Sequence, residues 1–221
     1  MFLIFLRFRL AIKYIVFKIY FERLMVLEIH IPNIPKQDRS LKRYESALQT
    51  ADIILAQKGI HAVTLKEIAK LSGIKRSSLY KFFPSNLAIL YALSKKHMSN
   101  LLNMLDANIV NTNFRDSSDF MTLVIDLLTI YLNEHKGSSI MLLSHDLPTK
   151  SDITLHSMNL LSSEIINKMN QKVENANSER VNNIVSIIIS LLSQGFHEEG
   201  EISPRIVNET KKASLAYLSA Y

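Results

Sequence analysis

The sequence contains no cysteine, and it has only five glycines and five prolines among 221 residues. Without cysteine the chain can form neither disulfide bonds nor thiolate zinc sites, which is compatible with the cytoplasmic location that we expect. Glycine and proline mark most turns, and few segments alternate apolar and polar residues as strands do. The sequence therefore predicts an all-α protein.

Motifs typical of enzymes are also missing. The chain has neither a glycine-rich loop that would hold a phosphate nor a Gly-x-Ser-x-Gly motif. His197 and Glu198 resemble the start of a zinc-protease motif, but no second histidine follows at the required position. No histidine pair has the four-residue spacing of a helical metal site. We expect a protein that is not an enzyme and that uses no cofactor or metal ion.

Residues 1–30 lack a long uncharged run although they are rich in apolar and aromatic side chains. The longest uncharged stretch is the first six residues, far below the roughly 18 needed to cross a bilayer. The runs are interrupted by Arg7, Arg9, Lys13, Lys18 and Arg23, which argues against a signal peptide. Three interpretations stay open: a translated leader before a true start at Met25, an extra helix packed on the body, or a membrane-associating arm. Residues 31–40 read as an extended linker.

The net charge of +6 is unevenly distributed along the chain. Residues 41–100 contain ten Lys or Arg and three Asp or Glu, whereas residues 101–221 contain nine basic and fourteen acidic residues. A basic segment provides affinity for nucleic acid without sequence preference. This asymmetry indicates a DNA-binding module followed by a separate regulatory module.

Residues 64–83 show the pattern of two short helices joined by a tight turn. Thr64 and Glu67 have capping-box spacing, which starts a helix at about residue 65. The predicted apolar face of this helix consists of Leu65, Ile68, Ala69 and Leu71. Gly73 ends the helix because glycine takes the left-handed conformation at little cost. A helix-turn-helix DNA reader has this arrangement.

The second helix is predicted over residues 75–82, and its outward positions are polar and basic. Leu79 and Phe82 or Phe83 face inward, Pro84 ends the helix and Ser85 caps the next one. Arg76 is the best candidate for a base contact because its fork of donors matches guanine, and Lys75 and Ser77 come second. The expected phosphate contacts are Thr64, Ser78, Tyr80 and Lys81.

At these residues the chain resembles the tetracycline-repressor (TetR) family of transcriptional regulators. The resemblance covers about residues 46–90 and rests on Ala47, Ala51, Ile54, Leu55, Ala56, Gly59, Gly73, Leu79, Tyr80, Phe83, Pro84 and Ser85. Asn86 and Leu87 stand where the family usually has Lys and Glu. The family's lysine commonly touches a phosphate, so the Asn86 amide is expected to replace that contact.

The resemblance implies two domains after the N-terminal extension and linker of residues 1–40. A three-helix DNA-binding domain would span residues 41–86, and a larger helical domain for ligand binding and dimerisation would span residues 87–221. The family dimerises through its last two long helices, which places the interface at about residues 180–196 and 203–219. A homodimer would then read a palindromic operator.

The larger domain is predicted from helical spacing of apolar residues to contain helices at about 87–109, 120–135, 138–144, 153–173, 180–196 and 204–219. Residues 184–192 contain more apolar side chains than is typical of a helix with one solvent-exposed side. Because the family holds an inducer among its middle helices, the candidate pocket residues are Phe120, Leu123, Leu127, Tyr131, Met141, Met158 and Leu161. His135, His145 and His156 are candidate polar groups there. Met and aromatic side chains at helical spacing belong to an ordinary core far more often than to a pocket, and single histidines are more often core or surface residues than pocket residues.

The leading hypothesis is a homodimeric repressor that an unidentified small molecule releases from its operator, with no membrane partner. One alternative keeps the fold but makes the protein a chromosome-organising factor that recruits another protein. A second alternative is a membrane-tethered regulator that uses residues 1–30.

Overall fold

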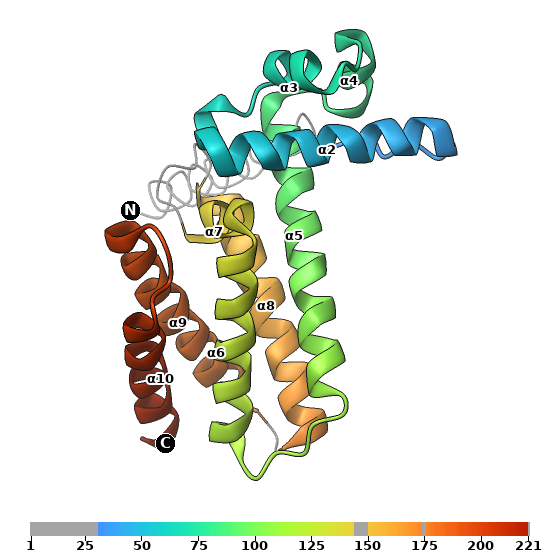
Figure 1. Cartoon of the computed structure of the whole chain (residues 1–221). Coiled ribbons are helices and arrows are strands. Elements are labelled where there is room, and N and C mark those ends of the chain that lie inside the picture. The colour runs from blue at the N-terminus through green and yellow to red at the C-terminus, as the bar shows by residue number, and fades with distance from the viewer. Residues whose placement is uncertain (1–30, 144–149, 174–175, 221) are drawn as a thin grey trace, which may run out of the picture. The chain divides into compact units, whose positions relative to one another are not determined.

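The computed structural model of the chain describes residues 31–143, 150–173 and 176–220. All regular structure in these ranges is helical, which confirms the predicted all-α fold (Figure 1). The predictions for residues 1–30, including Met25, and for His145 lie outside the described residues. The helices are α2 (Asp38–Lys58), η1 (Ile60–Ala62), α3 (Leu65–Ser72), α4 (Arg76–Phe82), α5 (Asn86–Ile109), α6 (Ser117–Glu134), α7 (Lys136–Leu143), α8 (Lys150–Lys172), α9 (Ser178–Glu199) and α10 (Pro204–Ser219).

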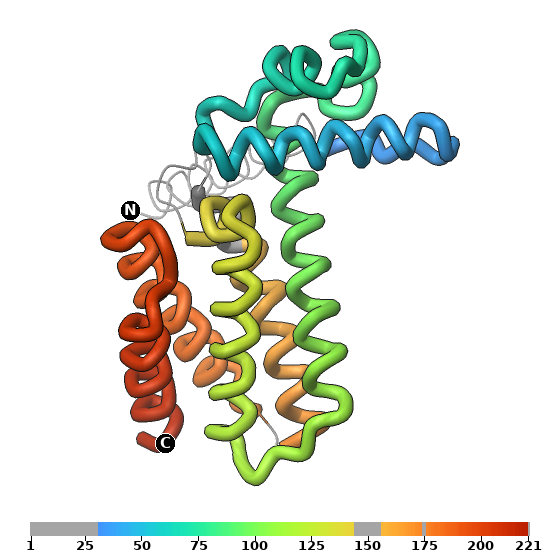
Figure 2. The backbone as a smooth tube through the Cα atoms, in the orientation of Figure 1, coloured from blue at the N-terminus to red at the C-terminus, as the bar shows by residue number. Residues whose placement is uncertain are grey.

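The described residues form two compact units, whose order along the chain can be followed in Figure 2. The reader unit contains residues 31–50 and 64–92, and the body unit contains residues 51–63 and 93–220. Helices α2 and α5 each contribute residues to both units. The domain boundary expected at residue 86 stays a prediction.

The reader unit is held together by an aromatic cluster beneath its short helices. The Tyr44 ring stacks on Phe83 with 4.8 Å between ring centroids, and Phe82 meets both rings edge-on. Burial raises the pKa of Tyr44 to about 12, with a smaller contribution from Glu45. Leu71, predicted to face this core, is instead 53% exposed, so the apolar spacing alone overestimated the buried face of α3.

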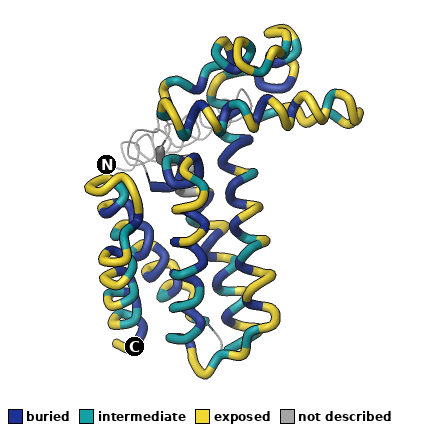
Figure 3. Tube along the Cα trace, viewed as in Figure 1, coloured by how far each residue is buried: buried dark blue, intermediate teal, exposed yellow. Residues whose placement is uncertain are grey.

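The body unit is a set of helices around one apolar core. Helix α10 packs against α9 and α6, while α7 and α8 contact α9. Ile184, Ile188 and Ile189 of α9 are buried, and the buried and exposed sides of these helices can be followed in Figure 3. The apolar run of α9 therefore lies largely inside the body, as its composition predicted.

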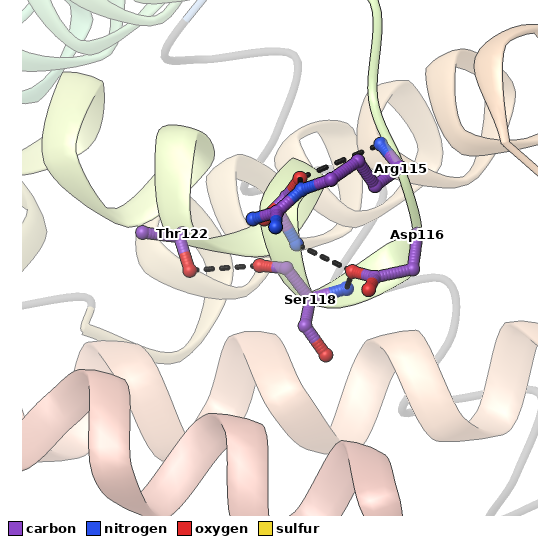
Figure 4. Close-up of polar contacts among 5 residues, drawn as sticks. Arg115, Asp116, Ser118 and Thr122 are labelled. Atoms are coloured by element: carbon purple, nitrogen blue, oxygen red, sulfur yellow. Dashed lines mark hydrogen bonds and ion pairs between the residues drawn. The ribbon is translucent and has the colours of Figure 1, made fainter.

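Helix α6 begins three residues earlier than the predicted start at Phe120 because Asp116 caps it. The Asp116 carboxylate accepts hydrogen bonds from the backbone N–H groups of Ser118 and Asp119, both at 2.9 Å (Figure 4). The Arg115 guanidinium forms two hydrogen bonds with the Asp119 carboxylate, at 2.5 and 2.6 Å. Polar residues thus form a first turn that apolar spacing could not reveal.

No helix in the described ranges combines the length and the apolar character needed to cross a bilayer. Within the same ranges, no group of three or more His, Asp or Glu side chains gathers where a metal ion could be held.

Candidate nucleic-acid interface

The start of α3 is fixed by two side chains that accept its first backbone donors. The Thr64 hydroxyl accepts a hydrogen bond from the Glu67 N–H at 3.2 Å. This confirms one of the two hydrogen bonds of the predicted capping box. The Asn86 side-chain oxygen accepts from the Leu65 N–H at 2.9 Å. Because the first N–H groups of a helix have no partner inside it, these two bonds anchor α3. Asn86 therefore has a structural contact that the sequence did not predict. The residue is exposed, and the bond to Leu65 uses its side-chain oxygen and not the N–H donors of its amide.

The turn between α3 and α4 has the predicted glycine geometry. Gly73 has a φ of 68°, in the left-handed region that disfavours other residues. The Ser72 hydroxyl donates to the Ile68 carbonyl at 2.7 Å and accepts from the Ile74 N–H at 3.3 Å. These bonds hold the short connection that carries the chain into α4.

Helix α4 has one buried and one exposed side. It begins at Arg76, one residue later than predicted, with Lys75 at the N-cap position. Leu79 and Phe82 are buried, and the exposed side chains are Lys75, Arg76, Ser77, Tyr80 and Lys81. Ser78 is half-buried. The predicted contact residues of α4 other than Ser78 thus share its exposed surface.

Arg76 and Tyr80 form a pair on this surface. An Arg76 terminal nitrogen lies 3.3 Å from the Tyr80 hydroxyl, and the guanidinium carbon lies 5.7 Å from the centre of the Tyr80 ring. Their spacing of one helical turn places them side by side. The contact orients the guanidinium while leaving other N–H donors for a nucleic-acid acceptor.

The end of α4 is held by Asn33, a residue that the sequence analysis did not single out. The Asn33 N–H donates to the Phe82 carbonyl at 2.7 Å, and its side-chain amide donates to the Lys81 carbonyl at 3.2 Å. The last carbonyls of a helix lack partners within it, so Asn33 caps α4 from 48 residues away.

The linker predicted over residues 31–40 is shorter than expected, because α2 already starts at Asp38.

The reader unit is strongly basic. Its described residues include nine Lys or Arg and three Asp or Glu. Helix α4 carries Arg76 and Lys81 and no acidic residue. This surface can attract a polyanion and offer several donors to phosphates and base edges.

The predicted pocket residues lie in the core of the body unit. Phe120, Leu127, Tyr131, Met141 and Leu161 are buried. Leu123 and Met158 are partly buried against the same core. Met141 lines a cavity of about 10 Å³, the space of about one water molecule, together with Ser94, His97, Met98, Leu101, Ser138, Leu142 and Ser157.

A polar network beside this cavity joins α2 to α5 and α6, and the sequence analysis missed it. Nε2 of buried His97 lies 3.0 Å from an Asp52 carboxylate oxygen. The Tyr131 hydroxyl donates to the His97 carbonyl at 3.1 Å, and burial raises the pKa of Tyr131 to about 12. The His135 ring stacks on Tyr131 at 4.2 Å, whereas His156 is exposed. Asp52 and His97 are 45 residues apart, so no sequence motif connects them.

A family model described as bacterial regulatory proteins, tetR family, matches residues 47–93. No curated protein matches the chain.

Solved structures share the fold over most of the chain. A TetR-family transcriptional regulator from Streptomyces coelicolor is 14% identical with a TM-score of 0.67, covering 80% of this chain and 98% of its own. FadR from Bacillus subtilis in complex with stearoyl-CoA is 17% identical with a TM-score of 0.59, covering 80% and 99%. A TetR regulator from Legionella pneumophila is 16% identical with a TM-score of 0.58, covering 77% and 94%.

Proposed function

Since this chain belongs to the tetR family of bacterial regulatory proteins and is a DNA-binding transcriptional regulator, we propose that it is a homodimeric repressor released from its operator by a small molecule. Members of this family are transcription factors, in agreement with the expectation that the chain is not an enzyme. The main support for the proposal is the exposed basic side of α4, a helix that is anchored by a buried aromatic cluster. The protein would act in the cytoplasm, where it meets the chromosome.

DNA recognition would use α4 in the major groove. Arg76 would donate to guanine O6 and N7, with Lys75 and Ser77 beside it. Thr64, Ser78, Tyr80, Lys81 and the Asn86 amide nitrogen would hold phosphates and set the register. Asn33 at one end of α4 and the Gly73 turn at the other would keep the helix in position.

Dimerisation would use the outward sides of α9 and α10. Ile187 and Leu191 are half-buried on α9, and the exposed Asn183 and Gln194 lie about one turn beyond them on either side. An apolar centre with a polar rim is typical of a protein interface. The small residues Ala213 and Ala216 on α10 would allow a close approach of helices. Two recognition helices related by a two-fold axis would read two half-sites.

We expect Ile187→Glu to convert the dimer into a monomer, because the substitution places a charge in the centre of this face. Sedimentation equilibrium measures the change, with Asn182→Glu on the exposed side of the same helix as the control. A wild-type protein that sediments as a monomer at ~10 µM would contradict the proposed interface.

Ligand response is supported by the family's architecture, whereas the cavity at Met141 has space for only about one water molecule. FadR from Bacillus subtilis, which shares the fold, was solved with stearoyl-CoA. In this chain the cavity would have to enlarge to admit a ligand, and the flexible side chains of Met98 and Met141 are suited to such a change. A ligand would weaken operator binding only if it binds the DNA-free conformation more tightly.

The decisive experiment is to isolate genomic DNA with the purified protein and to sequence the enriched fragments, using Arg76→Ala as the control. A local repressor enriches one or a few palindromic sites, and Arg76→Ala loses that preference. Many dispersed sites would favour the alternative of a chromosome-organising factor. No enrichment above background would contradict the assignment of α4 as a DNA reader.

A further inference from the structure

The stretch before α2 and the first turns of α2 carry exposed basic side chains that do not belong to the surface of α4. Residues 31–43 contain four Lys or Arg and one acidic residue. Arg43 donates to the Ser40 hydroxyl at 3.3 Å. Lys36 and Arg39 are exposed, and within the ranges that the structure describes neither forms an ion pair with a carboxylate. The charges of these two side chains are therefore available to a partner.

A contact made by Asn33 fixes the beginning of this stretch at the end of α4. The Asn33 N–H donates to the Phe82 carbonyl at 2.7 Å, and its side-chain amide donates to the Lys81 carbonyl at 3.2 Å. An extended chain advances at most about 3.6 Å per residue, so the Cα atom of Lys36 lies within about 11 Å of that of Asn33. Lys36 is therefore held near the end of α4, where Lys81 is also exposed.

A contact made by Tyr44 fixes the other end of the stretch. The Tyr44 ring stacks on Phe83 with 4.8 Å between ring centroids, and it meets Phe82 edge-on at 5.9 Å. Arg39 lies on α2 five residues before Tyr44, which corresponds to about 7.5 Å along the helix axis. Lys36 and Arg39 thus lie between two contacts with the residues that end α4. The same packing that positions α4 also positions these two cations.

We propose that Lys36 and Arg39 form a second DNA-contact surface, which binds backbone phosphates beyond the bases that α4 reads, and that Asn33 is its positioning residue. This inference rests on the proposed function, since it extends the DNA surface of α4. Each strand of a duplex carries one negative charge about every 3.4 Å along the axis, so a strand that passes the end of α4 brings several phosphates within the reach set by the two contacts. Lys and Arg bind phosphate through charge-assisted hydrogen bonds, which fix the register but add no base preference.

The first test measures the salt dependence of DNA binding by the full-length protein. Fluorescence anisotropy with two labelled duplexes of unrelated sequence, each of ~30 base pairs, gives the affinity between ~50 and ~200 mM potassium chloride. One lost phosphate contact lowers the salt slope by about 0.9, which is about an eightfold loss of affinity at ~100 mM salt relative to 1 M. Lys36→Ala and Arg39→Ala should each show this loss on both duplexes. Lys212→Ala, which removes an exposed lysine of α10, should change neither quantity.

A second variant tests the positioning role without removing a charge. Asn33→Ala loses the bond to the Lys81 carbonyl and should lower the salt slope by about one to two, because the cations are no longer held near the DNA. In a chain that already carries Lys36→Ala and Arg39→Ala, adding Asn33→Ala should lower the slope no further. A further loss in that background would overturn the positioning role, because Asn33 would then act through α4 alone.

The outcomes separate this surface from the proposed function. Wild-type protein that binds neither duplex at ~50 mM salt would refute DNA binding, and this surface with it. Wild-type binding with an unchanged slope in both Lys36→Ala and Arg39→Ala would refute this surface alone. A loss confined to one of the two duplexes would show that these side chains read bases instead of phosphates, contrary to the proposal.

An anionic membrane offers phosphates too, and the apolar side chains of Ile31 and Ile34 are exposed in the same stretch. Sedimentation with phosphatidylglycerol vesicles therefore forms a further arm. Vesicle binding that Lys36→Ala and Arg39→Ala abolish, together with an unchanged DNA salt slope, would overturn the proposal in favour of a membrane surface.

Discussion

Gly137, on α7, offers the sharpest test of the packing in the body unit. In most helices Gly→Ala stabilises a protein by about 1 kcal/mol. Here a Cβ atom would lie 1.9 Å from an Asp52 carboxylate oxygen and 3.3 Å from Nε2 of His97. The carboxylate must move, and its movement breaks the bond to His97, whose side chain is only 7% exposed.

The magnitude follows from these opposing effects. A buried group that loses its hydrogen-bond partner costs about 1–3 kcal/mol, and crowding adds to that cost. After subtracting the helix preference, we expect Gly137→Ala to lower the free energy of unfolding by about 1–2 kcal/mol. The melting temperature of the Gly137→Ala variant, measured by circular dichroism at the same protein concentration as the wild type, should be lower by roughly 2–8 °C.

A double-mutant cycle separates the steric contact from a general intolerance of the site. Asp52→Ala removes the obstructing carboxylate, so adding Gly137→Ala to that variant should be neutral or stabilising by up to about 1 kcal/mol. The two substitutions would then show a coupling of about 2 kcal/mol. If Gly137→Ala alone raised the melting temperature, the carboxylate would be free to move and the argument would fail.

Further predictions concern the reader unit. Arg76→Ala should relax sequence preference, while Lys81→Ala should weaken binding to all DNA and lower the salt slope by about one; fluorescence anisotropy at several salt concentrations measures both, and full affinity and specificity in both would refute the role of α4. Asn86→Ala should lower stability by about 1 kcal/mol in urea unfolding, because the Leu65 N–H loses its acceptor; unchanged stability would show that water replaces it. Since the pKa of Tyr44 is raised to about 12 in the folded chain, the folded state holds the proton more tightly, so stability present below pH 10 is lost as pH rises through about 12. Tyr44→Phe should remove that part of the alkaline loss, and an identical pH profile would contradict it.

The helix-turn-helix could be read from the sequence because its signals are local. The Thr64 cap acts on a donor three residues away, and Gly73 adopts its left-handed conformation through its own steric freedom. Pro84 likewise ends α4 without reference to distant residues. Helices α3 and α4 were therefore predicted to within one residue. The buried side of α3 was harder to predict, because a helix of eight residues makes only about two turns. Leu71, which was predicted to face the core, is exposed.

Contacts between residues far apart in the chain could not be predicted from the sequence. Asn33 holds the end of α4 across 48 positions, Asn86 holds the start of α3 across 21, and His97 meets Asp52 across 45. Each is an ordinary polar residue whose partner is chosen only when helices pack. Local sequence signals were enough to predict most of the helices and the helix-turn-helix motif, because backbone preferences and caps act within a few residues. Only packing decided which polar groups meet and where cavities remain, because both depend on how side chains from separate helices fill space.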